Sequence, residues 1–213
     1  MQISRLIPLI ALVTAVTVGV PPVMAQDLAA GKSAAEAGDF AKALENWQPL
    51  AEQGHTAAQY NLGMMHARGD GVEKDLTKAA EWFRRAAEQG HVESQARLGA
   101  MSVRGIGVEE DPEAAIKWLK LAAEQHHTES QFDLGVMYAN GNGVPRNHGT
   151  AYFWFTIAGL QDFRPAREAQ MRIRRLMPGA QIGQVEQRVR DWLEQNTDMR
   201  FERQGESSPL QFE

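Results

Sequence analysis

Three histidines recur at an interval of 36 residues, and histidine at repeated positions is a candidate metal ligand. They are His55, His91 and His127. A zinc ion holds nitrogen ligands at about 2 Å, whereas packed helices lie about 8–10 Å apart. If each interval contains two stacked helices, equivalent histidines cannot reach one ion. We therefore predict no metal site, and we expect these side chains to serve the turns that precede helices.

Arginines offer a second chemistry, the recognition of carboxylates. Arg68 and Arg104 share the same interval, and a guanidinium can hold a carboxylate through two parallel hydrogen bonds. They could form a short ladder for an acidic peptide or a carboxyl terminus. Alternatively, they could cap backbone carbonyls at the ends of helices. Both interpretations stay open.

A basic cluster near the C-terminal end has two interpretations as well. Its members are Arg164, Arg167, Arg172, Arg174 and Arg175. Arginines on the closing helix of a repeat array can form the polar outer face that such an array needs. The same cluster could contact anionic lipid or cell-wall polymer.

Catalytic motifs are missing from the sequence. It contains no nucleophile elbow, phosphate loop, HExxH or paired-carboxylate motif. The Gly-x-Gly segments follow predicted helices rather than strands, and no Lys-Ser or Lys-Thr pair follows them. Glu52, Glu88 and Glu124 recur at the 36-residue interval, which is typical of solvated helix ends. We predict neither enzymatic activity nor a cofactor.

The elements that carry these residues follow the same interval. Leucine-glycine pairs, Gly-Val pairs, tryptophans and alanines all recur every 36 residues, beginning at Leu62-Gly63, Gly71-Val72, Trp82 and Ala86. A fixed period between about 20 and 50 residues is typical of stacked repeats. Each unit then packs only on its neighbours, which leaves a long face available for binding.

Each unit is predicted to form two helices. In the first unit, residues 57–68 form one helix that ends at Gly69, and residues 76–89 form the second, with Asp75 as its N-cap. We expect Gly63 to allow close approach of the two helices and the tryptophans to fill the core beside it. Trp47 is expected to play the part of Phe83 in an earlier, shorter unit.

The pattern Ala-x3-Leu-Gly-x2-Tyr-x2-Gly-x-Gly-Val-x2-Asp-x3-Ala-x2-Trp-x3-Ala-Ala, as it stands between Ala58 and Ala87, resembles the Sel1-like repeat, a relative of the tetratricopeptide repeat. His66 and Ser102 replace a tyrosine that only Tyr138 retains, and Gly159 replaces the second alanine of the third unit. The resemblance implies an all-α fold, a right-handed α/α superhelix (solenoid) that serves as an adaptor for protein partners, often in bacterial envelopes. A cysteine-rich branch of the family is associated with β-lactams, but this chain has no cysteine.

The predicted organisation has five parts. These are a signal peptide (1–25), an N-terminal tetratricopeptide-like half-repeat or cap (26–56), three Sel1-like repeats over 57–164 (57–92, 93–128 and 129–164), two C-terminal capping helices (165–196) and a disordered tail (197–213).

The first 25 residues predict export. Arg5 precedes an uncharged apolar stretch, and Val23-Met24-Ala25 fits a signal-peptidase site with cleavage after Ala25. An uncleaved anchor is the alternative. The net charge of −5 becomes −6 without Arg5, which disfavours nonspecific nucleic-acid binding. We expect a periplasmic or secreted protein without disulfides and without stable membrane insertion after cleavage.

The concave face is expected to be lined by variable positions of the first helices. These are Tyr60, Asn61, Met64, Arg68, Arg97, Ala100, Arg104, Phe132, Asp133, Val136 and Asn140. Arginine and aromatic side chains often anchor interfaces. The leading hypothesis is an exported, non-catalytic scaffold that binds a protein or peptide partner in the envelope. The alternative is an envelope enzyme, or a modulator of a cell-wall enzyme, related to peptidoglycan or β-lactams.

Overall fold

Ten α-helices and no strand make up the part of the chain that the computed structural model describes, residues 23–196. The helices are α1 (Val23–Glu36), α2 (Phe40–Glu52), α3 (Thr56–Arg68), α4 (Leu76–Glu88), α5 (Val92–Arg104), α6 (Pro112–Glu124), α7 (Thr128–Asn140), α8 (His148–Gly159), α9 (Arg164–Arg174) and α10 (Gly179–Gln195). The all-α prediction is confirmed. The predicted tail and all but the last three residues of the predicted signal peptide lie outside the described residues.

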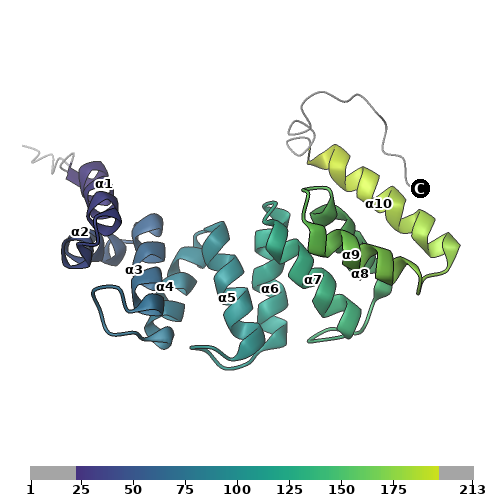
Figure 1. Ribbon diagram of the computed structural model, residues 1–213, viewed down its shortest axis with the longest axis horizontal. Coiled ribbons are helices and arrows are strands. Elements are labelled where there is room, and N and C mark those ends of the chain that lie inside the picture. Colours follow the sequence, from purple (N-terminus) through teal and green to yellow (C-terminus); the bar gives the residue numbers. More distant parts are fainter. Residues whose placement is uncertain (1–22, 197–213) are drawn as a thin grey trace, which may run out of the picture.

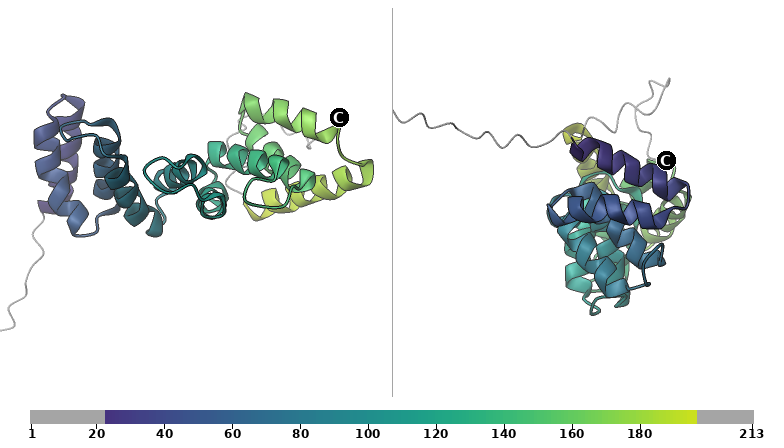
Figure 2. Two further views of the ribbon diagram at one scale, coloured as in Figure 1. Left: turned by 90° about the horizontal axis from the view of Figure 1, so that it is seen from below. Right: turned by 90° about the vertical axis from the view of Figure 1, so that its left-hand side faces the viewer.

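The helices form consecutive antiparallel pairs that stack into an α/α solenoid. Each of α1, α3, α5 and α7 packs on the helix that follows it, and each pair also contacts the next. Figure 1 shows the pairs along an arc, with α1 and α2 at one end and α10 at the other. Figure 2 shows the same stack from below and from its N-terminal end. Consequently the faces of α3, α5 and α7 lie side by side.

The helix ends follow the sequence signals. The side chains of Asp75, Asp111 and Asn147 cap α4, α6 and α8, each accepting a backbone N–H at 2.9 Å. Gly69 ends α3 in the left-handed conformation, with φ of 84°, and its N–H donates to the carbonyl of Met65. The predicted Asp75 cap and the predicted end of the first helix are confirmed.

A glycine of the first helix packs against one large apolar side chain of the second within each repeat pair. The pairs are Gly63 with Phe83, Gly99 with Leu119, and Gly135 with Phe155. A Cβ atom at Gly99 would lie 2.7 Å from Leu119 Cγ and 3.2 Å from its backbone nitrogen. The helices are therefore too close for any side chain at this position.

The predicted core position is confirmed for Trp154, which is buried, but not for the other two tryptophans of the register. Trp82 and Trp118 are only half-buried, and Arg85 and Lys117 place their cationic groups 4.5 and 5.4 Å from the ring centroids. The residue after each tryptophan is the one that packs on the glycine, because one residue turns the side chain by about 100° around a helix. Trp82 instead packs against the cluster formed by α1, α2 and α3.

Trp47 does take the predicted part of Phe83. Its indole ring occupies the space that a Cβ atom at Gly31 would need, and its Nε1 donates to the carbonyl of Leu28 at 3.2 Å. The shorter first helix pair therefore repeats the glycine–aromatic packing of the later repeats, with tryptophan as the aromatic side chain.

Glutamine side chains support the contacts between successive repeats. We call them the glutamine network: Gln59 with Gln89, Gln95 with Gln125, and Gln131 with Gln161. The first member of each pair donates to a carbonyl of the preceding repeat, that of Ala51, Ala87 or Ala123, at 3.0–3.1 Å. Its own side-chain carbonyl accepts from the second member at 2.6–2.8 Å. The junction between repeats is therefore held by amide hydrogen bonds.

The second loop glycine also belongs to these junctions. Gly71 and Gly143 lie so close to the preceding repeat that an added Cβ atom would be 2.5 Å from Phe40 Cβ and 2.6 Å from Pro112 Cβ. Gly107 has φ of 69° and approaches the backbone of Leu76 in the same way. The Gly-x-Gly loop thus combines a helix cap with a contact between repeats.

The C-terminal end has its own apolar core. Every residue from 151 to 158 of α8 is buried, because α9 and α10 cover the faces that α4 and α6 expose. Phe153 stands where earlier repeats carry Glu81 and Lys117, and its ring packs against Trp192 of α10 at 6.4 Å. Replacing surface charges by an aromatic residue creates the apolar face that the closing helices cover.

Candidate functional site

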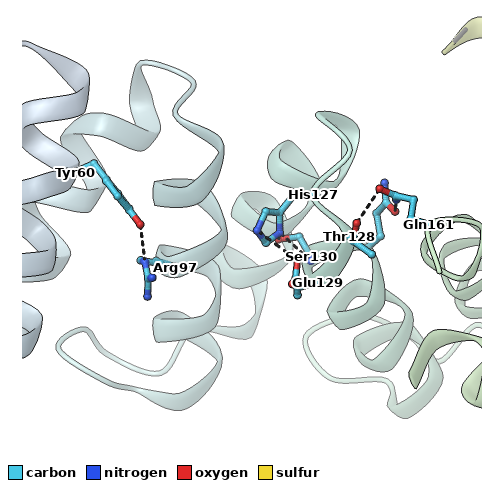
Figure 3. Close-up of polar contacts among 8 residues, drawn as sticks. Tyr60, Arg97, His127, Thr128, Glu129, Ser130 and Gln161 are labelled. Atoms are coloured by element: carbon cyan, nitrogen blue, oxygen red, sulfur yellow. Dashed lines mark hydrogen bonds and ion pairs between the residues drawn. The ribbon is translucent and has the colours of Figure 1, made fainter. Parts of the chain in front are cut away.

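A shallow groove crosses the face formed by α3, α5 and α7. Its volume is about 250 Å³, and its lining comes from three successive repeats. The lining residues are Tyr60, Glu93, Ala96, Arg97, Ala100, His127, Glu129, Ser130 and Asp133. Figure 3 shows Tyr60 and Arg97 pointing toward each other between α3 and α5, with His127, Glu129 and Ser130 at the start of α7.

The groove exists because the middle repeat carries small residues. Ala96 stands where the adjacent repeats have Tyr60 and Phe132, and Ala100 stands where the preceding repeat has Met64. The regular stack brings these positions into one row, so the two alanines leave a depression between larger neighbours. The shape of the groove therefore follows from the sequence register.

Arg97 is held at one side of the groove by aromatic rings. Its Nε donates to the hydroxyl of Tyr60 at 3.4 Å, and its guanidinium carbon lies 5.9 Å from the ring centroids of Tyr60 and Phe83. The Tyr60 ring also stacks against His91 at 4.7 Å. These contacts direct the guanidinium along the aromatic wall.

Histidine side chains cap α5 and α7 beside two glutamates of the groove. His127 Nδ1 accepts the backbone N–H of Ser130 at 3.2 Å, and His91 caps α5 in the same way. Since Nδ1 is the acceptor, the neutral ring carries its proton on Nε2, which faces Glu129 at 3.7 Å; the equivalent distance to Glu93 is 3.5 Å. The predicted role of these histidines in turns is confirmed.

His55 holds the same place before α3 but does not cap it with its side chain. Its buried Nδ1 has no hydrogen-bond partner among the described residues. Ala57 and Ala58 follow here instead of the glutamate and serine of the later repeats. The histidine–glutamate arrangement is therefore specific to the two repeats that border the groove.

Asp133 is the most perturbed carboxylate of the groove. Burial raises the pKa of its carboxyl above the ordinary value of 3.8, and Glu129 adds to this effect. The positive charge of Arg104, and of His127 when it is protonated, lowers the pKa in turn. No ion pair within 4.0 Å joins Asp133 to either group in the described part of the chain. Asp133 is thus partly desolvated and incompletely compensated.

Four of the residues predicted to line the face do meet in the groove, namely Tyr60, Arg97, Ala100 and Asp133. Phe132 does not line it, because its ring packs between Phe155 and Phe163, at 5.6 and 5.4 Å. The aromatic position that looked variable in the sequence is part of the packing of the third repeat.

The other predicted lining residues lie outside the groove. Asn61, Met64 and Val136 are half-buried, whereas Asn140 is exposed. The two arginines of the proposed ladder face different carboxylates. Arg68 lies 4.0 Å from Asp70 of its own loop, and Arg104 interacts electrostatically with Asp133 of the next repeat.

The sequence interpretation missed the acidic side of the groove. Glu93 and Glu129 follow the capping histidines in a shared His-x-Glu-Ser sequence, which residues 55–58 lack. This difference between repeats is visible in the sequence.

The basic cluster on α9 is largely paired within the chain. Arg164 pairs with Glu168 at 2.8 Å, and Arg167 with Asp162 at 2.7 Å. Arg174 lies 3.9 Å from Glu186 of α10. The first pair lies within α9, and the other two connect α9 to the preceding turn and to α10. They favour the capping interpretation over the lipid interpretation.

Neither a metal cluster nor a membrane span is found in residues 23–196. No group of three or more histidine, aspartate or glutamate side chains in this range is arranged to hold a metal ion. None of the described helices has both the length and the apolar character needed to cross a bilayer.

Comparisons with known proteins identify the repeat. The model of the Sel1 repeat family matches residues 31–55, 56–91, 92–127 and 128–163. The first match is shorter and covers much of the segment for which a tetratricopeptide-like helix pair was predicted. A search of curated proteins found no match.

Two solved structures are similar to this chain. A Sel1 repeat protein from Oxalobacter formigenes is 28% identical, with a TM-score of 0.64 over 70% of this chain and 62% of that chain. A protective antigen of uropathogenic Escherichia coli with an SLR fold is 26% identical, with a TM-score of 0.58 over 89% of this chain and 49% of that chain. This chain therefore spans less than two thirds of either relative.

Proposed function

This chain belongs to the Sel1 repeat family, and from that premise we propose that it is a non-catalytic scaffold that binds a protein or peptide partner across α3, α5 and α7. Sel1 repeats are typical of protein–protein interaction scaffolds. The observation that carries the proposal is the groove, in which three repeats contribute side chains to one depression. A stacked array offers such a row of positions to an extended segment of a partner.

The composition of the groove supports binding of a peptide. Its floor is formed by alanines, one wall is the ring of Tyr60, and the rim carries charges of both signs. An apolar floor with a polar rim is the usual make-up of a recognition surface. Tyrosine and arginine, here Tyr60 and Arg97, are the residue types that contribute most at such surfaces.

We further propose that the partner is met in the cell envelope, as a periplasmic or secreted protein. Arg5, the apolar stretch that follows it and Val23-Met24-Ala25 support export. N-terminal sequencing of the protein from fractionated cells tests this directly. A mature chain that begins at Gln26 in the periplasm or medium is expected, and an intact chain in the cytoplasm would contradict it.

Site-specific photocrosslinking in intact cells tests the scaffold. A photoreactive amino acid at Ala100 is expected to capture a discrete partner, because this position is at the groove floor. The matched control is the same group at Lys120, which is exposed on α6. Adducts that are equal at both positions, or absent at Ala100, would contradict the proposed binding face.

A further inference from the structure

We propose that the groove receives a basic side chain of the partner, an arginine or lysine, and that Asp133 is its principal ionic contact. This inference rests on the proposed function, since it specifies which partner the same groove accepts. It differs from the sequence expectation of an arginine ladder for acidic peptides, because the arginines of that ladder do not line the groove.

The charges that line the groove favour a cation. Three carboxylates face it, those of Glu93, Glu129 and Asp133, against the single guanidinium of Arg97. Arg97 already lies along the rings of Tyr60 and Phe83. Counting His127 as a cation would still leave three carboxylates against two positive groups in the lining. The excess charge of the lining is therefore negative.

The shape of the groove suits a long basic side chain. Arginine and lysine carry an apolar stem that covers apolar surface while the charged end reaches a polar partner. Ala96 and Ala100 offer a floor for such a stem, and the Tyr60 ring offers a wall. At the far side, Asp133 and Glu129 can accept charge-assisted hydrogen bonds from the cationic end.

The carboxylate of Asp133 lacks a close cationic partner in the groove. This carboxylate is partly desolvated, and the groups that face it are Arg104, His127 and Glu129. Arg104 compensates it from a distance, while Glu129 opposes its ionisation. A cation placed over Ala100 would supply the missing partner, and an acidic side chain there would add a fourth carboxylate to the site.

Selection of peptides from a random dodecapeptide display library tests the charge preference even though the natural partner is unidentified. The purified full-length protein is expected to enrich arginine and lysine and to deplete aspartate and glutamate relative to the unselected library. Ala100→Phe, which fills the floor, should abolish this enrichment. Enrichment of acidic peptides, or the same enrichment with the filled groove, would overturn the inference.

Affinity measurements on the best enriched peptide locate the ionic contact. Replacing its key arginine by citrulline removes the charge and keeps the shape, and we expect a loss of at least tenfold. Asp133→Asn should weaken binding at least fivefold, whereas Glu113→Gln, a change at an exposed site on α6, should leave it unaltered. Equal affinity of wild type and Asp133→Asn would refute the role of Asp133.

The outcomes separate this inference from the scaffold proposal. If crosslinking at Ala100 captures a partner but the selection yields acidic, neutral or no peptides, the scaffold proposal is supported and the proposed preference for a basic side chain is contradicted. If neither experiment gives a groove-dependent signal, both fail. Circular dichroism of Ala100→Phe and Asp133→Asn should match the wild type, which excludes unfolding as the cause of lost binding.

Discussion

The interfaces within a repeat and those between repeats are built on different principles. Within a repeat, Gly99 has no side chain, so the large side chain of Leu119 can pack directly against its helix. Between repeats, Gln95 donates a side-chain hydrogen bond across the junction to the carbonyl of Ala87, while Gln125 of its own repeat donates to the side-chain carbonyl of Gln95. The interface within a repeat depends on the volumes of the packed side chains, and the interface between repeats depends on the direction of hydrogen bonds.

This difference indicates how a solenoid controls its geometry. Apolar contact is non-directional, so it brings helices together without fixing their rotation. A buried amide must meet its donors and acceptors at defined angles, and an unmet group is destabilising. The glutamine network therefore fixes how one repeat sits on the next, and this relation sets the alignment of the groove residues.

The largest effect is expected for a side chain at the interface within a repeat. Gly99→Val should lower the free energy of unfolding by about 3 kcal/mol, because the new atoms meet both the side chain and the backbone of Leu119. Urea denaturation followed by circular dichroism measures this. Gly183→Ala is the matched control, since nothing lies within 4 Å of that position in α10. An unchanged midpoint for Gly99→Val would contradict the packing described here.

The next effect concerns the junction between repeats. Gln131→Leu should cost about 2 kcal/mol, because it removes the hydrogen bond that crosses to the Ala123 carbonyl, which keeps only the backbone N–H of His126, and it takes the acceptor from the Gln161 amide. The double variant Gln131→Leu/Gln161→Leu should cost less than the sum of the two single changes, since both remove the same amide–amide bond. Additive effects would show that the Gln161 amide does not help to hold Gln131, whose own bond to Ala123 crosses the junction. Gln184→Leu, at an exposed site on α10, provides the background value.

A smaller effect is expected where neither interface is touched. Asp111→Ala removes the side chain that accepts the N–H of Ala114 at the start of α6, at a cost of about 1 kcal/mol. Thermal unfolding measures this loss. Asp111→Asn keeps an accepting oxygen and should stay near wild type; equal losses for both variants would point away from capping.

The smallest effect should come from the groove, which lies outside both kinds of interface. Because the pKa of Asp133 is raised, its contribution to stability is present below pH 3.8 and is lost as the pH rises through the folded-state value. Asp133→Asn should therefore be at least as stable as wild type at pH 7, with the difference vanishing in acid. Denaturant midpoints between pH 3 and pH 7 measure it.

Asp75 is a control for Asp133, because its pKa is shifted in the opposite direction. The backbone N–H of Lys78 lowers the pKa of this carboxyl, so its stabilising contribution is present above pH 3.8 and is lost as the pH falls below that value. Asp75→Asn should consequently flatten the loss of stability in acid. The same pH trend for both variants would contradict the assigned environments.

The sequence predicted the fold well because the repeat register carries its own signals. Gly63 indicates a close approach of two helices, Gly69 indicates a helix end, and Asp75 indicates an N-cap. It misplaced Trp82, because periodicity shows that a side chain recurs and not which neighbour it faces. The buried glutamines were overlooked for a related reason, since a polar residue at a constant interval looks like a solvated position.

The groove could be predicted only in part. Tyr60, Arg97, Ala100 and Asp133 were identified because they vary between repeats. Glu93 and Glu129 were not, since only the stacking of the repeats brings them into one groove with Arg97 and Asp133. Ala96 contributes to the groove by being smaller than the aromatic residues at the same position of the adjacent repeats. The resulting depression can be recognised only when the neighbouring repeats are stacked.

The glutamine network also makes the repeats exchangeable units. Gln95 and Gln131 bond to Ala87 and Ala123, which hold the same place in successive repeats. A chain without residues 92–127 would present the Ala87 carbonyl to Gln131 and so rebuild an equivalent junction. The same deletion would remove Ala96 and Ala100, and with them the floor of the groove. Loss or gain of a unit can thus leave a well-joined array in which the groove has changed.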